Sequence, residues 1–126
     1  MAIDLDQFHE VFFLESFEAL DTMEGALLRL VPGAADAETV NTIFRVAHSI
    51  KGGAGIFGFN EVTSFTHTLE TLLDELRGGR MEVTAPICEG LLQSVDQIRG
   101  MLTSVQKHQP FDPAVAATLK AELTRL

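Results

Sequence analysis

The sequence contains no tryptophan and no tyrosine, and its only cysteine is Cys88. A single cysteine cannot form a disulfide within the chain, which excludes a small domain held together by disulfides. Basic residues are also scarce: 9 lysines and arginines stand against 18 acidic residues, for a formal net charge of −9. Because binding to a phosphate backbone needs clustered positive charge, we expect no nucleic-acid partner and no anionic membrane surface as a partner.

The chain also lacks a long apolar run. No hydrophobic stretch approaches the ~18 residues of a membrane-spanning helix, and the first residues include Asp4 and Asp6 in place of a basic leader segment. These features favour a cytoplasmic protein without a membrane partner. Cys88 is interpreted as a small buried hydrophobe, and His9 and His108 are expected at the surface.

The residues that are present favour helices throughout. Hydrophobic residues make up 46% of the 126 residues, and they recur at steps of three and four without the alternation of a strand. Five helices are expected, over about residues 4–30, 36–57, 61–77, 84–108 and 114–126. The expected N-caps are Asp36, Asn60 and Thr84, whose side chains can accept hydrogen bonds from free backbone N–H groups.

Short connections between long amphipathic helices imply antiparallel neighbours. We therefore predict an all-α fold: an antiparallel up-down four-helix bundle over residues 1–108, with a short fifth C-terminal helix in residues 109–126. That helix is either an appended packing helix or the start of an interdomain linker. The buried stripe predicted for the first helix is Leu5, Phe8, Phe12, Ala19, Met23, Leu27 and Leu30.

His48 is followed by an unusual density of glycine. Four glycines, at positions 52, 53, 55 and 58, lie within ten residues of it, in a segment that otherwise has a helical pattern. Glycine in a helix interior costs about 1 kcal/mol relative to alanine. We interpret Gly52, Gly53 and Gly55 as access positions, which leave the helix face beside the imidazole open to a phosphoryl donor and then to an acceptor.

A helical wheel places His48 about 100° from the buried stripe of its own helix. It places Glu70 about 100° from the buried stripe of the following helix. On antiparallel neighbours, equal offsets point either toward each other or apart. If they point toward each other, the Glu70 carboxylate can accept from Nδ1–H and leave Nε2 as the nucleophile. Lys51, one turn after His48, could neutralise phosphoryl oxygens, and His67 lies one turn before Glu70. These residues lack an established zinc-ligand spacing, so no metal is expected.

Three segments resemble one known family. Ala47–Phe59 resembles the phosphorylation motif of histidine phosphotransfer (HPt) domains, and more closely that of the first (P1) domain of the CheA family of chemotaxis histidine kinases. Thr66–Asp74 is similar to the second motif of that family, and Phe12–Leu20 is similar to its first helix. The resemblance covers roughly residues 5–107.

The resemblance implies a site and two partners. It implies that a histidine-kinase ATP-binding domain phosphorylates Nε2 of His48, which then passes the phosphoryl group to an aspartate of a response regulator of the CheY or CheB type. It also implies that Glu70 orients His48 while Lys51 and His67 support the site. This domain would itself bind no cofactor, and ATP would enter only through the partner kinase domain.

The sequence contains no ATP-binding motif, so it is expected to be a modular phosphoacceptor and phosphodonor, monomeric by itself, rather than an independent enzyme. Two other functions stay open: a helical interaction module with an incidental histidine, and a stand-alone phosphorelay protein. Candidate partner-binding residues are Asn41, Arg45, Ile56 and Phe59. For Ile56 and Phe59 the alternative is a local contact between helices.

Overall fold

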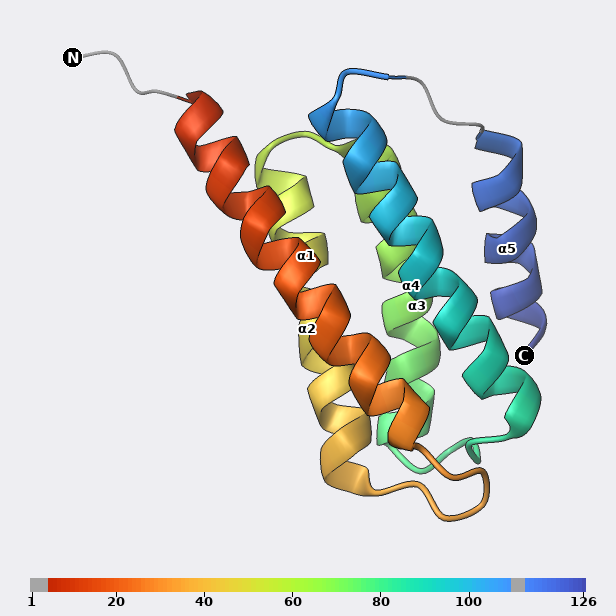
Figure 1. The fold of residues 1–126 in the computed structure, drawn as a ribbon. Coiled ribbons are helices and arrows are strands. Elements are labelled where there is room, and N and C mark those ends of the chain that lie inside the picture. Colours follow the sequence, from red (N-terminus) through yellow and green to blue (C-terminus); the bar gives the residue numbers. More distant parts are fainter. Residues whose placement is uncertain (1–4, 110–112) are drawn as a thin grey trace.

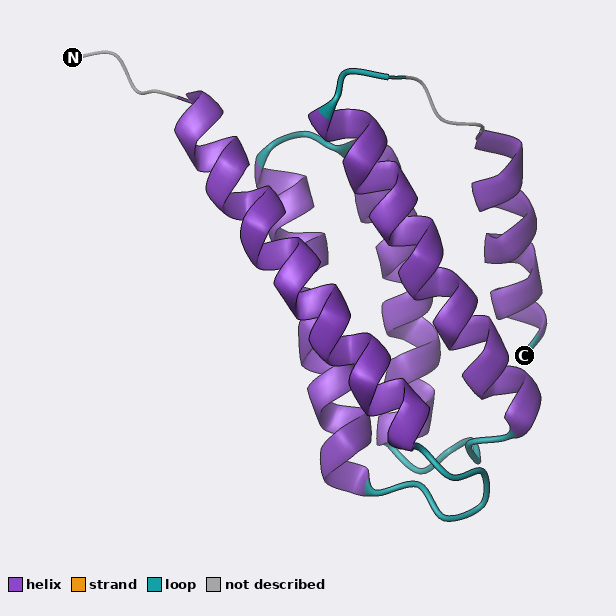
Figure 2. Cartoon of the chain, in the orientation of Figure 1, coloured by secondary structure: helices purple, strands orange, loops and turns teal. Residues whose placement is uncertain are grey.

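A computed structural model describes residues 5–109 and 113–126, in which all regular structure is helical, as Figure 2 shows. The five helices are α1 (Leu5–Arg29), α2 (Ala37–Ile56), α3 (Asn60–Arg77), α4 (Ala85–Gln106) and α5 (Pro113–Arg125). All five match the expected segments to within a few residues. The expected start of the first helix at residue 4 lies outside the described residues.

The first four helices form a closed bundle (Figure 1). α1 packs against α2 and α4, and α3 packs against the same two helices from the other side. α5 lies outside this bundle, against α3 and α4, where it buries Leu119 and Leu123 and leaves Val115 exposed. The predicted all-α fold, an antiparallel four-helix bundle with a fifth C-terminal helix, is confirmed.

Two of the three expected N-caps are confirmed. A side-chain oxygen of Asp36 accepts from the backbone N–H of Glu38 at 3.4 Å, and the hydroxyl of Thr84 accepts from the N–H of Ile87 at 3.3 Å. Each bond satisfies a backbone donor that the first turn of a helix leaves free. The starts of α2 and α4 are therefore specified locally by one side chain each.

The third expected N-cap, Asn60, is wrong, because the connection between α2 and α3 is too tight for it. Gly58 has a positive φ of 75°, its N–H donates to the carbonyl of Gly55 at 3.2 Å, and the N–H of Phe59 donates to that of Ala54 at 2.9 Å. This pair of bonds is the Schellman ending of a helix. α3 begins at Asn60 itself, and its cap position holds Phe59 without a side-chain bond.

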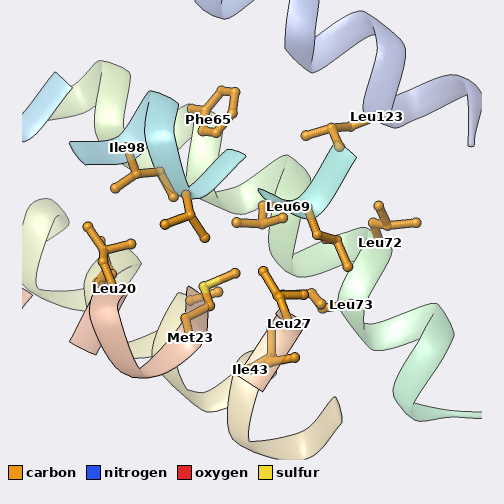
Figure 3. Close-up of a cluster of buried hydrophobic side chains, with 14 of the residues drawn as sticks. Leu20, Met23, Leu27, Ile43, Phe65, Leu69, Leu72, Leu73, Ile98 and Leu123 are labelled. Atoms are coloured by element: carbon orange, nitrogen blue, oxygen red, sulfur yellow. The ribbon is translucent and has the colours of Figure 1, made fainter. Parts of the chain in front are cut away.

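The core lies mainly between α1, α2, α3 and α4, and Leu119 and Leu123 of α5 join it at one side. Figure 3 shows part of this cluster, in which Met23 and Phe65 lie among aliphatic side chains. Full burial of one such side chain stabilises the fold by about 1.5–3 kcal/mol. The largest of the fully buried side chains are Leu20, Met23, Leu27, Ile43, Ile50, Phe65, Leu69, Leu73, Leu91, Ile98, Met101 and Leu102. Cys88 is half-buried against this core, and burial raises the pKa of its thiol.

The stripe predicted for α1 is wrong at Phe8, whereas Phe12 packs half-buried against the core, and the side chain of Leu5 lies outside the described residues. Phe8 is exposed, whereas Phe13 and Leu20 are buried. The buried face reaches Leu20 through Ser16, which is itself buried. Because a serine occupies this core-facing position, hydrophobicity alone shifts the apparent stripe by one residue.

Candidate functional site

The imidazole of His48 lies on the outer side of α2, with 65% of its side chain exposed. Its Nδ1 is 3.2 Å from Oε2 of Glu70 on α3, so the equal offsets of these residues do point toward each other. When the neutral ring donates its Nδ1–H to a carboxylate, the lone pair is left on Nε2. Among the described residues, no side chain forms a hydrogen bond with Nε2.

Glu70 also binds Lys51, and this second contact keeps the carboxylate charged. Nζ of Lys51 lies 3.0 Å from Oε1 and 3.0 Å from Oε2. Partial burial acts to raise the pKa of Glu70, but hydrogen bonds from Lys51 and His48, together with the positive charge of Lys51, hold it below the ordinary value. Glu70 is therefore an ionised acceptor for Nδ1–H, and Lys51 lies one turn from the imidazole.

The glycines after His48 differ in their surroundings. A Cβ added to Gly52 or to Gly55 would meet no atom within 4 Å, so the surface at both positions is open. A Cβ at Gly53 would lie 2.5 Å from Cε1 of Phe12 on α1. The structure thus gives Gly53 a reason other than access: α1 packs against α2 through this position.

His67 lies outside the group formed by His48, Lys51 and Glu70. Its side chain is exposed and lines a groove of about 260 Å³ together with Thr71, Leu123 and Leu126. The groove runs between α3 and the C-terminal end of the chain. The structure therefore does not bring His67 into the hydrogen-bonded group, although the sequence places it one turn from Glu70.

The four candidate partner-binding residues have different environments. Ile56 at the end of α2 is 81% exposed, Arg45 is exposed, and Asn41 is half-buried. Phe59 is half-buried, and its ring lies 5.8 Å from that of Phe13, nearly parallel to it. The local contact between helices that was the alternative for Phe59 is therefore present.

His9 belongs to the same aromatic group as Phe59, and it is half-buried rather than at the surface. Its ring centroid is 4.7 Å from that of Phe57 and 5.5 Å from that of Phe59. His108 is exposed as expected. These ring contacts pack α1 against the turn that follows α2.

Phe44, which lies beside His48, and Arg77, which lies over the Phe44 ring, were not found from the sequence. The ring of Phe44 is nearly parallel to the imidazole, at 10° with centroids 6.1 Å apart. The guanidinium carbon of Arg77 lies 3.7 Å from the centroid of the Phe44 ring. The spacing could have indicated both, because Phe44 is four residues before His48 and Arg77 is seven after Glu70, which places each on the same helix face as its neighbour.

Within residues 5–109 and 113–126, no group of three or more His, Cys, Asp or Glu side chains could hold a metal ion. None of the described helices is both long enough and apolar enough to cross a lipid bilayer.

A helical bundle that presents an exposed histidine held by a carboxylate of the next helix has the features of a histidine phosphotransfer domain. The family model for the Hpt domain matches residues 7–126, and the chain belongs to this family. Chemotaxis protein CheA of Salmonella typhimurium is 44% identical over 114 residues, or 90% of this chain. The chain spans only 17% of the length of that relative.

Two solved structures share the fold. The phosphorylated P1 domain of CheA3 in complex with CheY6 from R. sphaeroides superposes with a TM-score of 0.85 at 28% identity, covering 95% of this chain and 94% of that chain. The CheA phosphotransferase domain from Thermotoga maritima has a TM-score of 0.74 at 31% identity, covering 82% and 98%. The site lies within the shared bundle.

Proposed function

We propose that this domain carries a phosphoryl group on Nε2 of His48, between the ATP-binding domain of a chemotaxis histidine kinase and an aspartate of a response regulator. The observation that carries the proposal is the 3.2 Å contact from Nδ1 to Glu70 on a ring whose side chain is 65% exposed. This contact fixes the tautomer and leaves the other nitrogen accessible. The complex of a similar P1 domain with CheY6 supports a regulator of the CheY type as the acceptor.

In the first step the lone pair of Nε2 attacks the γ-phosphorus of ATP held by the kinase domain. The N–P bond forms, the bond from this phosphorus to the β,γ-bridging oxygen breaks, and ADP leaves. The ring gains positive charge while it keeps its proton on Nδ1, and the ionised Glu70 stabilises that charge. Lys51, one turn away, supplies a cation for the phosphoryl oxygens.

In the second step a carboxylate oxygen of the regulator's aspartate attacks the phosphorus. The N–P bond breaks and its electron pair returns to Nε2, which restores the neutral imidazole with its proton on Nδ1. Since the leaving ring is neutral, it leaves more readily than an imidazole anion would. The same Nδ1–H···Glu70 contact therefore serves both acceptance and release.

Access to Nε2 has to suit two different proteins in turn. Gly52 and Gly55 leave the surface near the imidazole open, and Ile56 presents an exposed apolar side chain one turn beyond Gly52. We propose that Ile56, Arg45 and Asn41 contact the partners. We also propose the cytoplasm as the compartment and a monomer as the state of the free domain, because each exchange needs a one-to-one encounter and the donor step needs ATP.

The test is His48→Gln, incubated with labelled ATP and the cognate kinase ATP-binding domain. Wild type should acquire a label that is labile in acid and stable in base, and the variant should acquire none while its helical circular dichroism and melting temperature stay unchanged. His67→Gln is the matched control: it should still take the label, at a lower rate if His67 supports the site. Label on the His48→Gln variant, or none on wild type, would overturn the proposal and favour an interaction module with an incidental histidine.

A further inference from the structure

One hydrogen bond does not fix the plane of the His48 ring. The contact from Nδ1 to Glu70 restrains one atom of a ring that is otherwise held only through its bond to Cβ, so small coupled rotations about χ1 and χ2 can still tilt the ring within hydrogen-bonding distance. Most of the side chain is exposed, so the core does not hold the ring either. In-line attack by Nε2 on phosphorus requires the lone pair to point along one direction, and a second restraint is therefore needed.

Phe44 is placed to provide that restraint. Its ring, one helical turn before His48, is half-buried against the core and lies within 10° of parallel to the imidazole. The two ring centroids are 6.1 Å apart, so an imidazole that tilts toward Phe44 brings its edge against that ring. Phe44 therefore limits the rotation that Glu70 leaves free.

Arg77 in turn holds Phe44. The planar guanidinium stands 3.7 Å from the centroid of the Phe44 ring, well inside the ~6 Å range of a cation–π contact. Nη2 of Arg77 donates to Oδ1 of Asp74 at 2.7 Å, which fixes the arginine one turn back on α3. The contacts thus run from Asp74 to Arg77, to Phe44 and to His48, beside the direct contact from Glu70.

We propose that Phe44 and Arg77 are positioning residues for phosphotransfer, which set the plane of the His48 ring so that Nε2 faces the incoming phosphorus. The inference rests on the proposed function of His48. Neither residue touches the reacting atoms: Arg77 acts through Phe44, and Phe44 acts through the imidazole. The competing explanation is that Arg77 only shields an apolar ring at the surface.

Four variants separate these explanations. Phe44→Leu keeps an apolar side chain but removes the flat face, and Phe44→Tyr restores the face. Arg77→Gln removes the cation at an exposed position where folding is not at risk. Arg80→Gln is the matched control, since Arg80 lies in the turn just after α3 and also pairs with Asp74, while Arg77 is the cation over the Phe44 ring in the part of the chain that the structure describes.

The first measurement is the steady-state phosphorylation of the domain by the cognate kinase ATP-binding domain. Phe44→Leu and Arg77→Gln should each lower kcat by roughly threefold to tenfold, with KM for the domain nearly unchanged. The double variant should be no slower than Phe44→Leu alone, because Arg77 acts through that ring. Phe44→Tyr and Arg80→Gln should match wild type.

The second measurement is NMR of the His48 ring, which needs no partner. Ring-carbon relaxation should show greater imidazole mobility in Phe44→Leu and Arg77→Gln, while nitrogen shifts show the same Nδ1–H tautomer. An unchanged kcat, a change confined to KM, or a ring as rigid as in wild type would overturn the positioning role. If wild-type protein takes no label from the kinase domain, the proposed function fails instead, and the ring mobility still reports on the Phe44–Arg77 contact.

Discussion

Alanine at Gly52 and alanine at Gly53 should have opposite effects on stability, although the two positions are adjacent on α2. A Cβ at Gly52 meets nothing within 4 Å. Replacing glycine by alanine there should therefore give the full gain in helix propensity, about 1 kcal/mol. The same gain at Gly53 is offset by a steric conflict.

The conflict at Gly53 is with the ring of Phe12. The new Cβ would lie 2.5 Å from Cε1 and 2.7 Å from Cδ1, whereas carbon atoms in contact prefer ~3.5–4.0 Å. The ring must retreat by about 1 Å, but Phe13, Phe57 and Phe59 lie around it with centroids at 5.6, 5.5 and 5.8 Å. Overpacking of this kind costs about 1–3 kcal/mol, so Gly53→Ala should be destabilised by up to ~2 kcal/mol after the propensity gain.

Chemical denaturation of the two single variants and wild type measures both effects. We expect the free energy of unfolding to rise for Gly52→Ala and to fall for Gly53→Ala. Adding Phe12→Leu removes the ring atoms that conflict with the new Cβ, so the cost of Gly53→Ala should shrink in that background. If Gly53→Ala is as stable as Gly52→Ala, the packing argument for Gly53 is wrong and the position is free for access.

Three further predictions concern single substitutions. Gly52→Gln should keep or raise the melting temperature but slow both phosphorylation and transfer to the regulator, because its side chain leans back over His48; transfer at the wild-type rate would show that the open surface does not serve access. Glu70→Gln should be less stable than wild type at neutral pH. Since the pKa of Glu70 in the folded state lies below the ordinary 4.5, its ionised form stabilises the fold above that pH, and the stability difference should disappear as the pH falls through the lowered pKa. Persistence of the difference in acid, measured by denaturation across pH, would count against the ion pairs as its cause. His108→Gly should stabilise the end of α4 by about 1 kcal/mol and raise the melting temperature by roughly 4 °C, because His108 has a φ of 55°; an unchanged melting temperature would argue against strain there.

The contact between His48 and Glu70 could be anticipated because helical geometry is regular. Two residues displaced equally from the cores of consecutive helices have only two relative orientations, and the family resemblance favoured the one in which they meet. The N-caps Asp36 and Thr84 could also be predicted from the sequence, because a capping side chain binds a backbone N–H within three residues of itself. Predictions of this kind need only the local geometry of one or two helices.

The errors arose where a residue's role depends on a more distant element. Ser16 faces the core, so the apolar pattern of α1 did not reveal its true buried side. Phe59 and His9 are distant in sequence, and their contact depends on the angle at which α1 crosses α2. Asn60 has the chemistry of an N-cap, but the N–H of Thr63 that it would accept already donates to the carbonyl of Phe59 at 3.0 Å, so the helix begins one residue earlier.

The glycine-rich run after His48 shows why one residue type can satisfy several separate physical demands. Gly52 faces open space, Gly53 faces the ring of Phe12, and Gly58 has a positive φ that costs other residues about 1–2 kcal/mol. Only the first demand concerns the reactive face of the helix, while the second positions α1 and the third turns the chain into α3. Since α3 carries Glu70, the turn at Gly58 also determines which carboxylate meets the imidazole. In this glycine-rich run, Gly52 therefore keeps the surface near His48 open, Gly53 lets α1 pack against α2, and Gly58 forms the turn that brings α3 beside His48.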